Sequence, residues 1–388
     1  MSIVISPTIQ NGKLNGLGVE QRYPTKQRGL SFYEGVENTE INRDIVKNHR
    51  GLFYAVSFKS DRVILTRDIL GSKPLYYNDR LAVSNFKKFV PEFREVLPGE
   101  YLELGYDGEV IFQEITEFFE VIKPGEFDKP VIEERIIESL EKKKFGNACL
   151  SFSGGIDSSF LAYFYDVPLI AVTASKAEEK RIKDAARLLG KDVDIFRFDL
   201  ETLKNTLPAV ITAIETSNPL QVSIALPIYL SMNYAKSLGF TEIVFGQGAD
   251  ELFGGYKRYE NLIGKSLEKA LLEDILNIGD NNLVRDAKLS YINEMKLHTP
   301  YLDFDIIESA LSIPVEFKIY RESGRVIRKY FLRELARRYI PTELAYASKK
   351  AIQYSTNTYK MLEKVAKSYK AELGDFLRGM HGDQAELH

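Results

Sequence analysis

The sequence is poor in the residues that build several common kinds of site. Cys149 is the only cysteine, so the chain cannot form an intramolecular disulfide, a zinc–thiolate cluster or a CxxC redox centre. We expect Cys149 to be a small core residue, because an apolar strand pattern surrounds it. Tryptophan is absent, and two of the four histidines are His381 and His388. The chain therefore has few of the histidine and cysteine side chains that a zinc hydrolase or a serine–histidine triad would need.

Long hydrophobic runs and an excess of positive charge are also missing. No apolar stretch approaches the ~18 residues that a membrane span needs, and the start of the chain lacks a secretory pattern. The expected compartment is therefore the cytoplasm, with no membrane partner. A formal net charge of -3 disfavours a general nucleic-acid binder. The 388 residues, 44% of them hydrophobic, predict an ordinary globular chain of two domains.

The pattern of turns and periodicities changes at a proline-containing segment, 123–130. Before it, residues 1–122 predict a smaller β-rich domain, with the hairpin signal Tyr106-Asp-Gly108. After it, residues 131–374 alternate between strand and helix patterns, which is typical of an α/β domain with a parallel sheet. Residues 375–388 are predicted to be a flexible tail. Within the α/β part we expect strands at 148–152, 168–173, 194–198 and 242–245, helices at 131–145, 160–164, 176–189 and 225–238, and mainly helix after 256.

The strongest sign of chemistry is Ser153-Gly-Gly-Ile-Asp-Ser-Ser159, which follows a strand and opens a helix. Adjacent glycines let the backbone approach a ligand, and the serine hydroxyls and the helix N-terminus add donors for an anion. These features predict a phosphate or pyrophosphate cradle, for which Asp157 would require a bridging Mg²⁺. The alternative is a tight strand-to-helix turn with serine caps. The residues expected to bind are Ser153, Gly154, Gly155, Asp157, Ser158 and Ser159.

A second glycine-rich loop, Gly246-Gln-Gly-Ala-Asp-Glu251, also follows a predicted strand. Gly246 and Gly248 permit a close loop, and Asp250 is positioned to hold a metal or to cap the next helix. A capped helix start is the alternative for this loop alone. In an open α/β sheet, ligands bind where neighbouring strands end, so two such loops together favour a ligand site.

A basic pattern occurs later in the chain. Arg325, Lys329, Arg333 and Arg337 recur at helical spacing, which predicts one helix over 325–338 with a basic stripe. A solvated face, a contribution to the potential around the phosphates, and a nucleic-acid contact remain open as roles for this stripe.

The two loops together resemble the asparagine synthetase and β-lactam synthetase branch of the N-type ATP pyrophosphatases. Further segments agree in order, namely Arg67-Asp-Ile-Leu-Gly-Ser-Lys-Pro-Leu-Tyr-Tyr77, Thr299-Pro-Tyr-Leu-Asp303, Arg328-Lys-Tyr-Phe-Leu-Arg333 and Lys349-Lys-Ala-Ile-Gln-Tyr354. The resemblance implies a PP-loop ATP pyrophosphatase domain with a helical extension, after a degenerate, shortened Ntn-hydrolase-like glutaminase domain. It covers roughly residues 50–355.

The resemblance also implies a reaction, in which a carboxylate attacks the α-phosphorus of Mg-ATP and an amine or ammonia then displaces AMP. Asp157 and Asp250 match the family's Mg²⁺ carboxylates. A late lysine matches its catalytic cation; register favours Lys350, with Lys349 open, and a solvated loop is the alternative for both. By analogy, adenine would lie near Val172 and Ala174.

This chain departs from the family pattern at several positions. Ser2 stands where the glutaminase has its cysteine nucleophile; a serine nucleophile and a degenerate packing domain are both open, with the second favoured. In the acceptor segment, Leu220, Gln221 and Ser223 replace threonines and an arginine. Gln247 replaces an acid and cannot act as a carboxylate base. His298 replaces an arginine before Pro300.

These departures favour amide synthesis on a small carboxylate other than aspartate, although aspartate to asparagine is the family default. The expected cofactors are ATP and Mg²⁺, and the expected partners are the carboxylate and ammonia or an amine. A separate ammonia-supplying protein and a homodimer remain open. The alternatives are a non-catalytic or partner-dependent nucleotide-binding subunit and a tRNA-modifying PP-loop enzyme, although nucleic acid is disfavoured by the charge.

Overall fold

The computed structural model describes residues 2–322, 324–347, 352 and 356–385. The chain forms two compact units. Unit 1 contains the described residues up to 123 together with 276–296, and unit 2 contains residues 124–275 and those from 297 onward. Residues 276–296, which the sequence pattern had placed in the second domain, therefore belong to unit 1.

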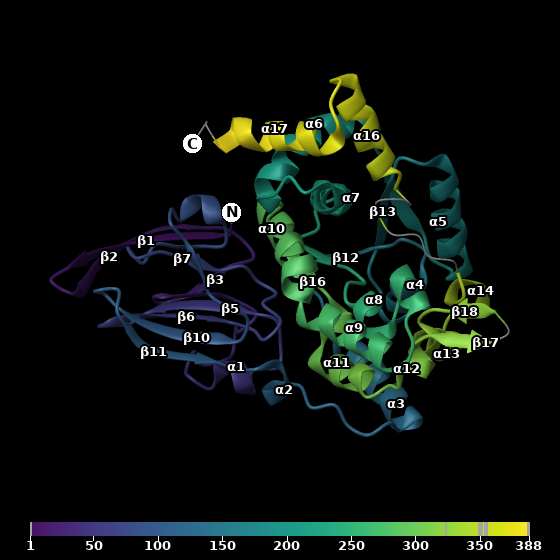
Figure 1. The fold of residues 1–388 in the computed structure, drawn as a ribbon, viewed down its shortest axis with the longest axis horizontal. Coiled ribbons are helices and arrows are strands. Elements are labelled where there is room, and N and C mark those ends of the chain that lie inside the picture. The colour runs from purple at the N-terminus through teal and green to yellow at the C-terminus, as the bar shows by residue number, and fades with distance from the viewer. Residues whose placement is uncertain (1, 323, 348–351, 353–355, 386–388) are drawn as a thin grey trace. The chain divides into compact units, whose positions relative to one another are not determined.

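Unit 1 is built from two antiparallel sheets (Figure 1). The order in one sheet is β2-β1-β8-β7-β9 and in the other β11-β10-β6-β5-β4-β3. The buried cluster takes side chains from both sheets, among them Ile5, Val83, Val56 and Leu102. The strands are β1 Ile3–Gln10, β2 Lys13–Gln21, β3 Lys26–Arg28, β4 Ser31–Glu34, β5 Tyr54–Phe58, β6 Arg62–Arg67, β7 Tyr76–Tyr77, β8 Val83–Ser84, β9 Arg94–Glu95, β10 Glu100–Gly105 and β11 Val110–Ile115.

The expected hairpin at Tyr106–Gly108 is confirmed, since β10 pairs with β11; β5 likewise pairs with β6, and β7 with β8. Short helical segments complete the unit: α1 Ile45–Asn48, η1 Lys87–Phe89, α2 Phe118–Val121, the π-helical turn η3 Gly279–Leu283 and α10 Val284–Ile292. From α10, the Tyr291 hydroxyl donates a 2.9 Å hydrogen bond to the buried Glu34 carboxylate, which also pairs with Lys73 at 2.6 Å. This contact ties the late segment to the early one.

Unit 2 contains a sheet of order β14-β13-β12-β15-β16. β12 pairs in parallel with β13 and β15, and β13 with β14, which confirms the predicted parallel α/β fold. The chain runs from β12 outward to β14 and then returns to β15 on the other side of β12. The order of the strands therefore reverses between β12 and β15, which is where ligands bind in such sheets. The strands are β12 Ala148–Ser151, β13 Leu169–Thr173, β14 Val193–Arg197, β15 Glu242–Val244 and β16 Lys296–His298, with a separate hairpin of β17 Tyr320–Glu322 and β18 Arg325–Ile327.

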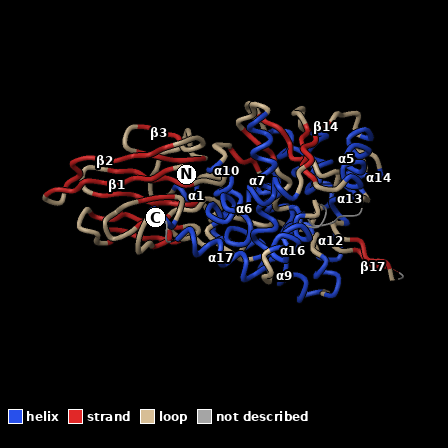
Figure 2. Tube along the Cα trace, turned by 90° about the horizontal axis from the view of Figure 1, so that it is seen from above, coloured by secondary structure: helices blue, strands red, loops and turns tan. Residues whose placement is uncertain are grey.

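Helices make up most of the rest of unit 2, whereas unit 1 is mainly strand and loop (Figure 2). Each predicted helix of the α/β part is present, with α6 as an addition. The helices are α3 Lys129–Lys142, α4 Ile156–Phe164, α5 Lys176–Leu188, α6 Leu200–Ile214, α7 Pro219–Ser237, α8 Ala249–Phe253, η2 Lys257–Asn261, α9 Gly264–Leu276, η4 Pro300–Leu302, α11 Phe304–Leu311, α12 Val315–Lys318, α13 Tyr330–Ala336, α14 Thr342–Ala345, α16 Thr358–Ser368 and α17 Leu373–Ala385.

Two predictions about the later part of the chain are wrong. The expected flexible tail, 375–388, is helical as far as residue 385, because α17 packs against α6 and α7 and buries Leu377 completely. The expected single helix over 325–338 is instead the strand β18 followed by α13. Its continuity is broken at Lys329, whose φ of 55° is left-handed. Within the described residues, no helix is both long and apolar enough to cross a membrane.

Candidate functional site

The first predicted loop connects β12 to α4 and has the geometry of an anion cradle. Gly154 adopts a φ of +65°, and a Cβ there would lie 2.8 Å from the Cβ of Ala185, so both conformation and space require glycine. The Ser158 hydroxyl accepts a 3.1 Å hydrogen bond from the Ser153 amide and lies 3.1 Å from the Ser153 hydroxyl. The buried Ser159 hydroxyl has no hydrogen-bond partner among the described residues. These donors surround the first turn of α4, which is favourable for an anion.

Arg181 of α5 fixes the same loop from its carbonyl side. Its guanidinium donates to the carbonyl oxygens of Ser153 at 2.5 Å and Gly154 at 3.2 Å, and it pairs with Glu178 at 2.6 Å. With these carbonyls bound to Arg181, the loop is held in one conformation. Sequence reasoning missed this residue because it lies within an otherwise ordinary charged helix.

The second predicted loop, between β15 and α8, packs directly on the first. A Cβ at Gly246 would lie only 3.0 Å from the Cβ of Asp157. Gly248 has a φ of +93°, and a Cβ there would lie 2.4 Å from Leu302. Gln247 is half-buried between these two glycines. The fold therefore brings together the two loops that the sequence had singled out.

The centre of the site is a buried lysine between two aspartates. The Lys329 ammonium lies 2.5 Å from Asp157 Oδ1 and 2.8 Å from Asp250 Oδ1. The Lys329 side chain is 1% exposed, against 13% for Asp157 and 19% for Asp250. Asp157 lies on α4 and Asp250 on α8, and α13, which begins just after Lys329, packs against both helices. The three charges thus meet through tertiary packing.

The sequence analysis named Lys329 as part of a basic helical stripe, but did not predict that it pairs with the two aspartates. Its helical spacing from Arg325 and Arg333 suggested a stripe on one face, and this interpretation is wrong. Arg325 is exposed on β18, while Arg333 is buried and donates to the carbonyls of Arg328 and Ala345 at 2.8 and 2.6 Å. Burial lowers the pKa of Arg333. The only available signal was the position of Lys329 in the segment matching the family's Lys-x-x-Leu-Arg pattern.

Thr299–Asp303, another segment that resembles the family pattern, contacts the first loop through Tyr301. The Tyr301 hydroxyl donates a 3.0 Å hydrogen bond to the backbone carbonyl of Asp157. Complete burial, together with the nearby Asp157 carboxylate, raises the pKa of Tyr301 well above its usual value. The phenol therefore stays neutral and acts as a donor that positions the start of α4. His298, just before this segment, lies 2.8 Å from the Glu242 carboxylate at the start of β15.

The remaining predicted site residues lie on neighbouring elements. Val172 is buried near the carboxyl end of β13, and the Ala174 amide, just after this strand, donates to the Thr356 carbonyl at 3.3 Å. In the acceptor segment, Leu220 is half exposed near the start of α7, and the Ser223 hydroxyl bonds back to the Leu220 carbonyl at 2.8 Å. Lys349 and Lys350 lie outside the described residues.

The residues at the two loops fit a magnesium–nucleotide. Mg²⁺ in nucleotide sites is held by one or two carboxylates together with phosphate oxygens and water. Asp157 and Asp250 supply two carboxylates that converge on one point, next to a cradle rich in hydroxyl and amide donors. Among the described residues no group of three or more histidine, cysteine or acidic side chains could hold a metal alone, so this pair would rely on the phosphates.

In unit 1, the serine at the family's nucleophile position is not accessible. Ser2 is fully buried, and its hydroxyl hydrogen-bonds to that of Thr25, which in turn bonds the Tyr54 hydroxyl. Burial, with the Glu34 carboxylate nearby, raises the pKa of Tyr54. The described contacts of the Ser2 hydroxyl are with this series of hydroxyls, and its complete burial supports the packing role.

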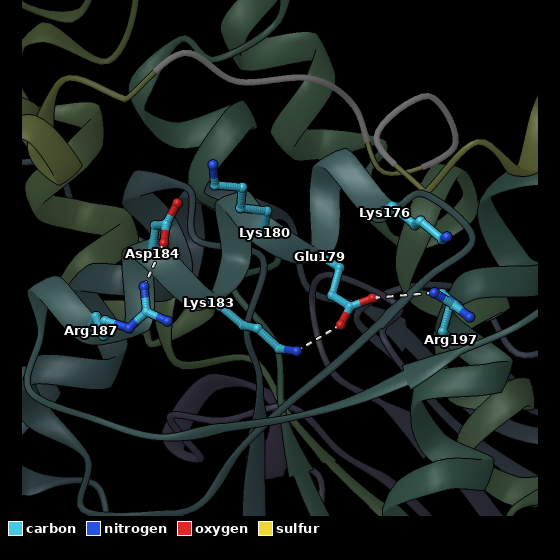
Figure 3. A pocket seen from close by; sticks show the side chains of 7 residues that line it. All are labelled: Lys176, Glu179, Lys180, Lys183, Asp184, Arg187 and Arg197. Carbon is cyan, nitrogen blue, oxygen red and sulfur yellow. Dashed lines mark hydrogen bonds and ion pairs between the residues drawn. The ribbon is translucent and has the colours of Figure 1, made fainter.

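A hollow along α5 carries many charges but is not part of this site. Figure 3 shows its lysine and arginine side chains together with Glu179 and Asp184. Glu179 pairs with Lys183 at 2.7 Å and Arg197 at 3.9 Å, and Asp184 with Arg187 at 2.7 Å. Five cations and two carboxylates line the hollow, so it keeps a positive charge. Its ion pairs are formed by exposed lysine and arginine side chains, and the hollow therefore has the character of a solvated basic helix face.

The sheet reversal, the glycine-rich cradle and the paired aspartates define the class as an α/β protein whose parallel sheet has two glycine-rich loops at the carboxyl ends of its strands. The asparagine synthase family model matches residues 142–269 and 263–379. The chain is 30% identical to a putative glutamine-hydrolysing asparagine synthetase of Methanocaldococcus jannaschii, an alignment covering 90% of this chain and 76% of that protein. This protein belongs to the asparagine synthase family.

More distant relatives show how much of the family's length this chain covers. It is 24% identical to the Escherichia coli asparagine synthetase B, over 80% of this chain and 62% of that protein. It is 28% identical to an Arabidopsis thaliana asparagine synthetase, over 51% of this chain and 37% of that protein. The chain thus spans less than two thirds of the length of these two relatives.

Proposed function

We propose that this protein is an ATP-dependent, amide-forming synthetase that activates a carboxylate as an acyl-adenylate, releasing pyrophosphate. The carboxylate oxygen attacks the α-phosphorus, and the bond to the β-phosphate oxygen breaks. Ammonia or an amine then attacks the acyl carbon, AMP leaves, and the nitrogen loses a proton. The observation that carries the proposal is the convergence of Asp157 and Asp250, from two loops, beside the cradle at Ser153–Ser159.

The residues of the site have separate tasks in this reaction. Loop amides and the hydroxyls of Ser153 and Ser158 would hold the leaving pyrophosphate. Asp157 and Asp250 would hold magnesium, which when bound screens negative charge on the phosphates. Lys329 lies close enough to this pair to add a second cation. Gln247 would contact the acyl group through its amide, since it cannot act as a carboxylate base.

Free ammonia or an amine is the nitrogen source that this proposal favours. The buried, hydrogen-bonded Ser2 supports a unit 1 that does not hydrolyse glutamine by itself. A separate ammonia-supplying protein remains part of the proposal, as does a homodimer. Aspartate is the family's default carboxylate, but Leu220, Gln221 and Ser223 favour a different acceptor because none of them supplies a cation for a second carboxylate.

Nucleotide product analysis tests the proposal directly. Purified protein with Mg-ATP is given aspartate and ammonia, aspartate and glutamine, and then a pool of other carboxylates and amines. AMP and pyrophosphate formed in equal amounts, in any mixture, support a synthetase and identify its substrate. If the protein bound ATP but formed no AMP in any mixture, the synthetase proposal would be overturned in favour of a nucleotide-binding subunit. The observation that favours this second candidate is Gln247, which cannot act as a carboxylate base.

A further inference from the structure

Lys329 contacts both aspartates to which the proposed function assigns the metal. We infer that Lys329 makes divalent-metal binding at Asp157 and Asp250 depend on the presence of nucleotide phosphates. The inference rests on the proposed function, in which these two carboxylates hold magnesium. Lys329 is then a positioning residue that determines when the metal binds, separate from any contact it makes with the reacting atoms.

The Lys329 ammonium occupies the point on which both carboxylates converge. Its Nζ lies within ion-pair distance of Oδ1 of each aspartate, at 2.5 and 2.8 Å. Two carboxylates and one ammonium leave a single net negative charge shared among three groups, of which Asp157 and Lys329 are buried and Asp250 is partly exposed. A divalent cation that approaches this pair alone meets an ammonium at close range in a poorly solvated place, where repulsion between charges is strong.

The backbone keeps Lys329 from swinging away to make room. Its φ of 55° and ψ of 34° fix the direction in which the side chain leaves the chain, and its carbonyl accepts a 2.9 Å hydrogen bond from the Arg333 amide. Gly255 lines the path, because a Cβ there would lie 2.3 Å from Lys329 Cε and 1.7 Å from Asp250 Oδ1. Only 1% of the Lys329 side chain is exposed, so the ammonium is held among protein groups and not in solvent.

Phosphates change this balance. A nucleotide triphosphate in the cradle at Ser153–Ser159 brings several negative charges next to the three groups. The metal and Lys329 can then share the carboxylates and the phosphate oxygens, so that neither cation is left without an anion. Mg²⁺ also gives up its water reluctantly and is usually held through substrate phosphates as well as carboxylates. We therefore expect metal and nucleotide to bind together.

The first experiment measures binding of Mn²⁺, a spectroscopic substitute for Mg²⁺, by electron paramagnetic resonance without nucleotide. Wild-type protein should bind Mn²⁺ weakly. Lys329→Met leaves two carboxylates without their buried cation, so its affinity for Mn²⁺ alone should rise roughly tenfold or more. Unchanged affinity in folded Lys329→Met would overturn the inference. Lys318→Met is the matched control, because Lys318 is also a buried lysine of unit 2 and does not contact the aspartate pair; its Mn²⁺ affinity should equal that of wild type.

The wild-type protein gives a second test in case Lys329→Met does not fold. Pyrophosphate or a non-hydrolysable ATP analogue should produce a protein-bound Mn²⁺ signal that Asp157→Asn removes. Tight Mn²⁺ binding by the wild type without any phosphate, lost in Asp157→Asn, would contradict the inference. Neither measurement requires turnover. If both Mn²⁺ measurements give the expected results but no AMP is formed in product analysis, the proposed synthetase activity is wrong and the dependence of metal binding on phosphates is supported. If AMP is formed but Lys329→Met binds Mn²⁺ no more tightly than wild type, only the inference about Lys329 is wrong.

Discussion

Lys329 Nζ lies 2.5 Å from Asp157 Oδ1, although the two residues are far apart in the sequence. Asp157 belongs to the cradle and lies in the first turn of α4, and Lys329 immediately precedes α13. The ion pair therefore joins the early and late parts of unit 2 at the carboxyl ends of β12 and β15. A buried pair of this kind stabilises the fold weakly by itself, but the loss of one partner leaves an uncompensated charge.

Replacing either aspartate of the pair should abolish pyrophosphate release. We expect Asp157→Asn and Asp250→Asn each to lower the rate of AMP formation at least about a hundredfold, because magnesium loses a charged ligand. Product analysis measures the rate, and circular dichroism checks the fold. Asp184→Asn is the control, since Asp184 is an exposed carboxylate bound to Arg187 on α5. Normal turnover in either site variant would remove the aspartate from the metal site.

Loss of the Arg181 guanidinium should loosen the phosphate cradle. Arg181→Met removes the donors to the carbonyls of Ser153 and Gly154, so the loop samples more conformations and the KM for ATP should rise about tenfold. Initial rates over a range of ATP concentrations give this value. Arg187→Met, on the same helix but exposed, should leave KM unchanged. An equal effect in both variants would indicate a general change in α5 and not a role in the loop.

Lys318 should make stability depend on pH in the alkaline range. Burial lowers its pKa from 10.5 to about 8, so the unfolded state holds this proton more tightly than the folded one. The destabilisation is complete below pH 8 and disappears as pH rises from about 8 to 10.5. Lys318→Met should therefore raise the free energy of unfolding at pH 7 by about 1–3 kcal/mol. Its advantage over wild type should shrink toward pH 10.5 in denaturant titrations; a constant difference would exclude the buried ammonium of Lys318 as its cause.

The Ser2 hydroxyl should have no catalytic part. Ser2→Ala removes its hydrogen bond with Thr25 and should cost about 1 kcal/mol of stability, with synthesis from ammonia unchanged. Glutamate release from glutamine and thermal unfolding are the two measurements. Lys13→Ala, on the exposed side of β2, serves as a control within unit 1. If Ser2→Ala lost glutamine-dependent synthesis alone, the serine would be a nucleophile after all.

Much of the candidate site follows from short stretches of chain. A buried strand, a pair of glycines and a helix start within a few residues at Ser153–Ser159, and again at Gly246–Glu251. These local requirements can be recognised in the sequence because they concern space and φ at particular positions. Gly154, for example, has both a left-handed φ and a close neighbour in Ala185. The prediction that both loops follow parallel strands is confirmed by β12 and β15.

Other parts of the site depend on contacts that no local pattern carries. The spacing of Arg325, Lys329 and Arg333 is that of a helix. In the structure, however, Lys329 has a left-handed backbone conformation and α13 begins after it, packed against α4 and α8. Likewise, 276–296 joins unit 1 through the bond from Tyr291 to Glu34, which are 257 residues apart.

The sequence by itself thus determined the class of fold, the two loops and the aspartates, because each depends on residues close together in the chain. Only the tertiary structure decided which cation lies between Asp157 and Asp250, and that Arg181 holds the first loop. The physical reason is that a buried charge is stable only where a partner of opposite charge reaches it, and that partner is chosen by how distant helices pack.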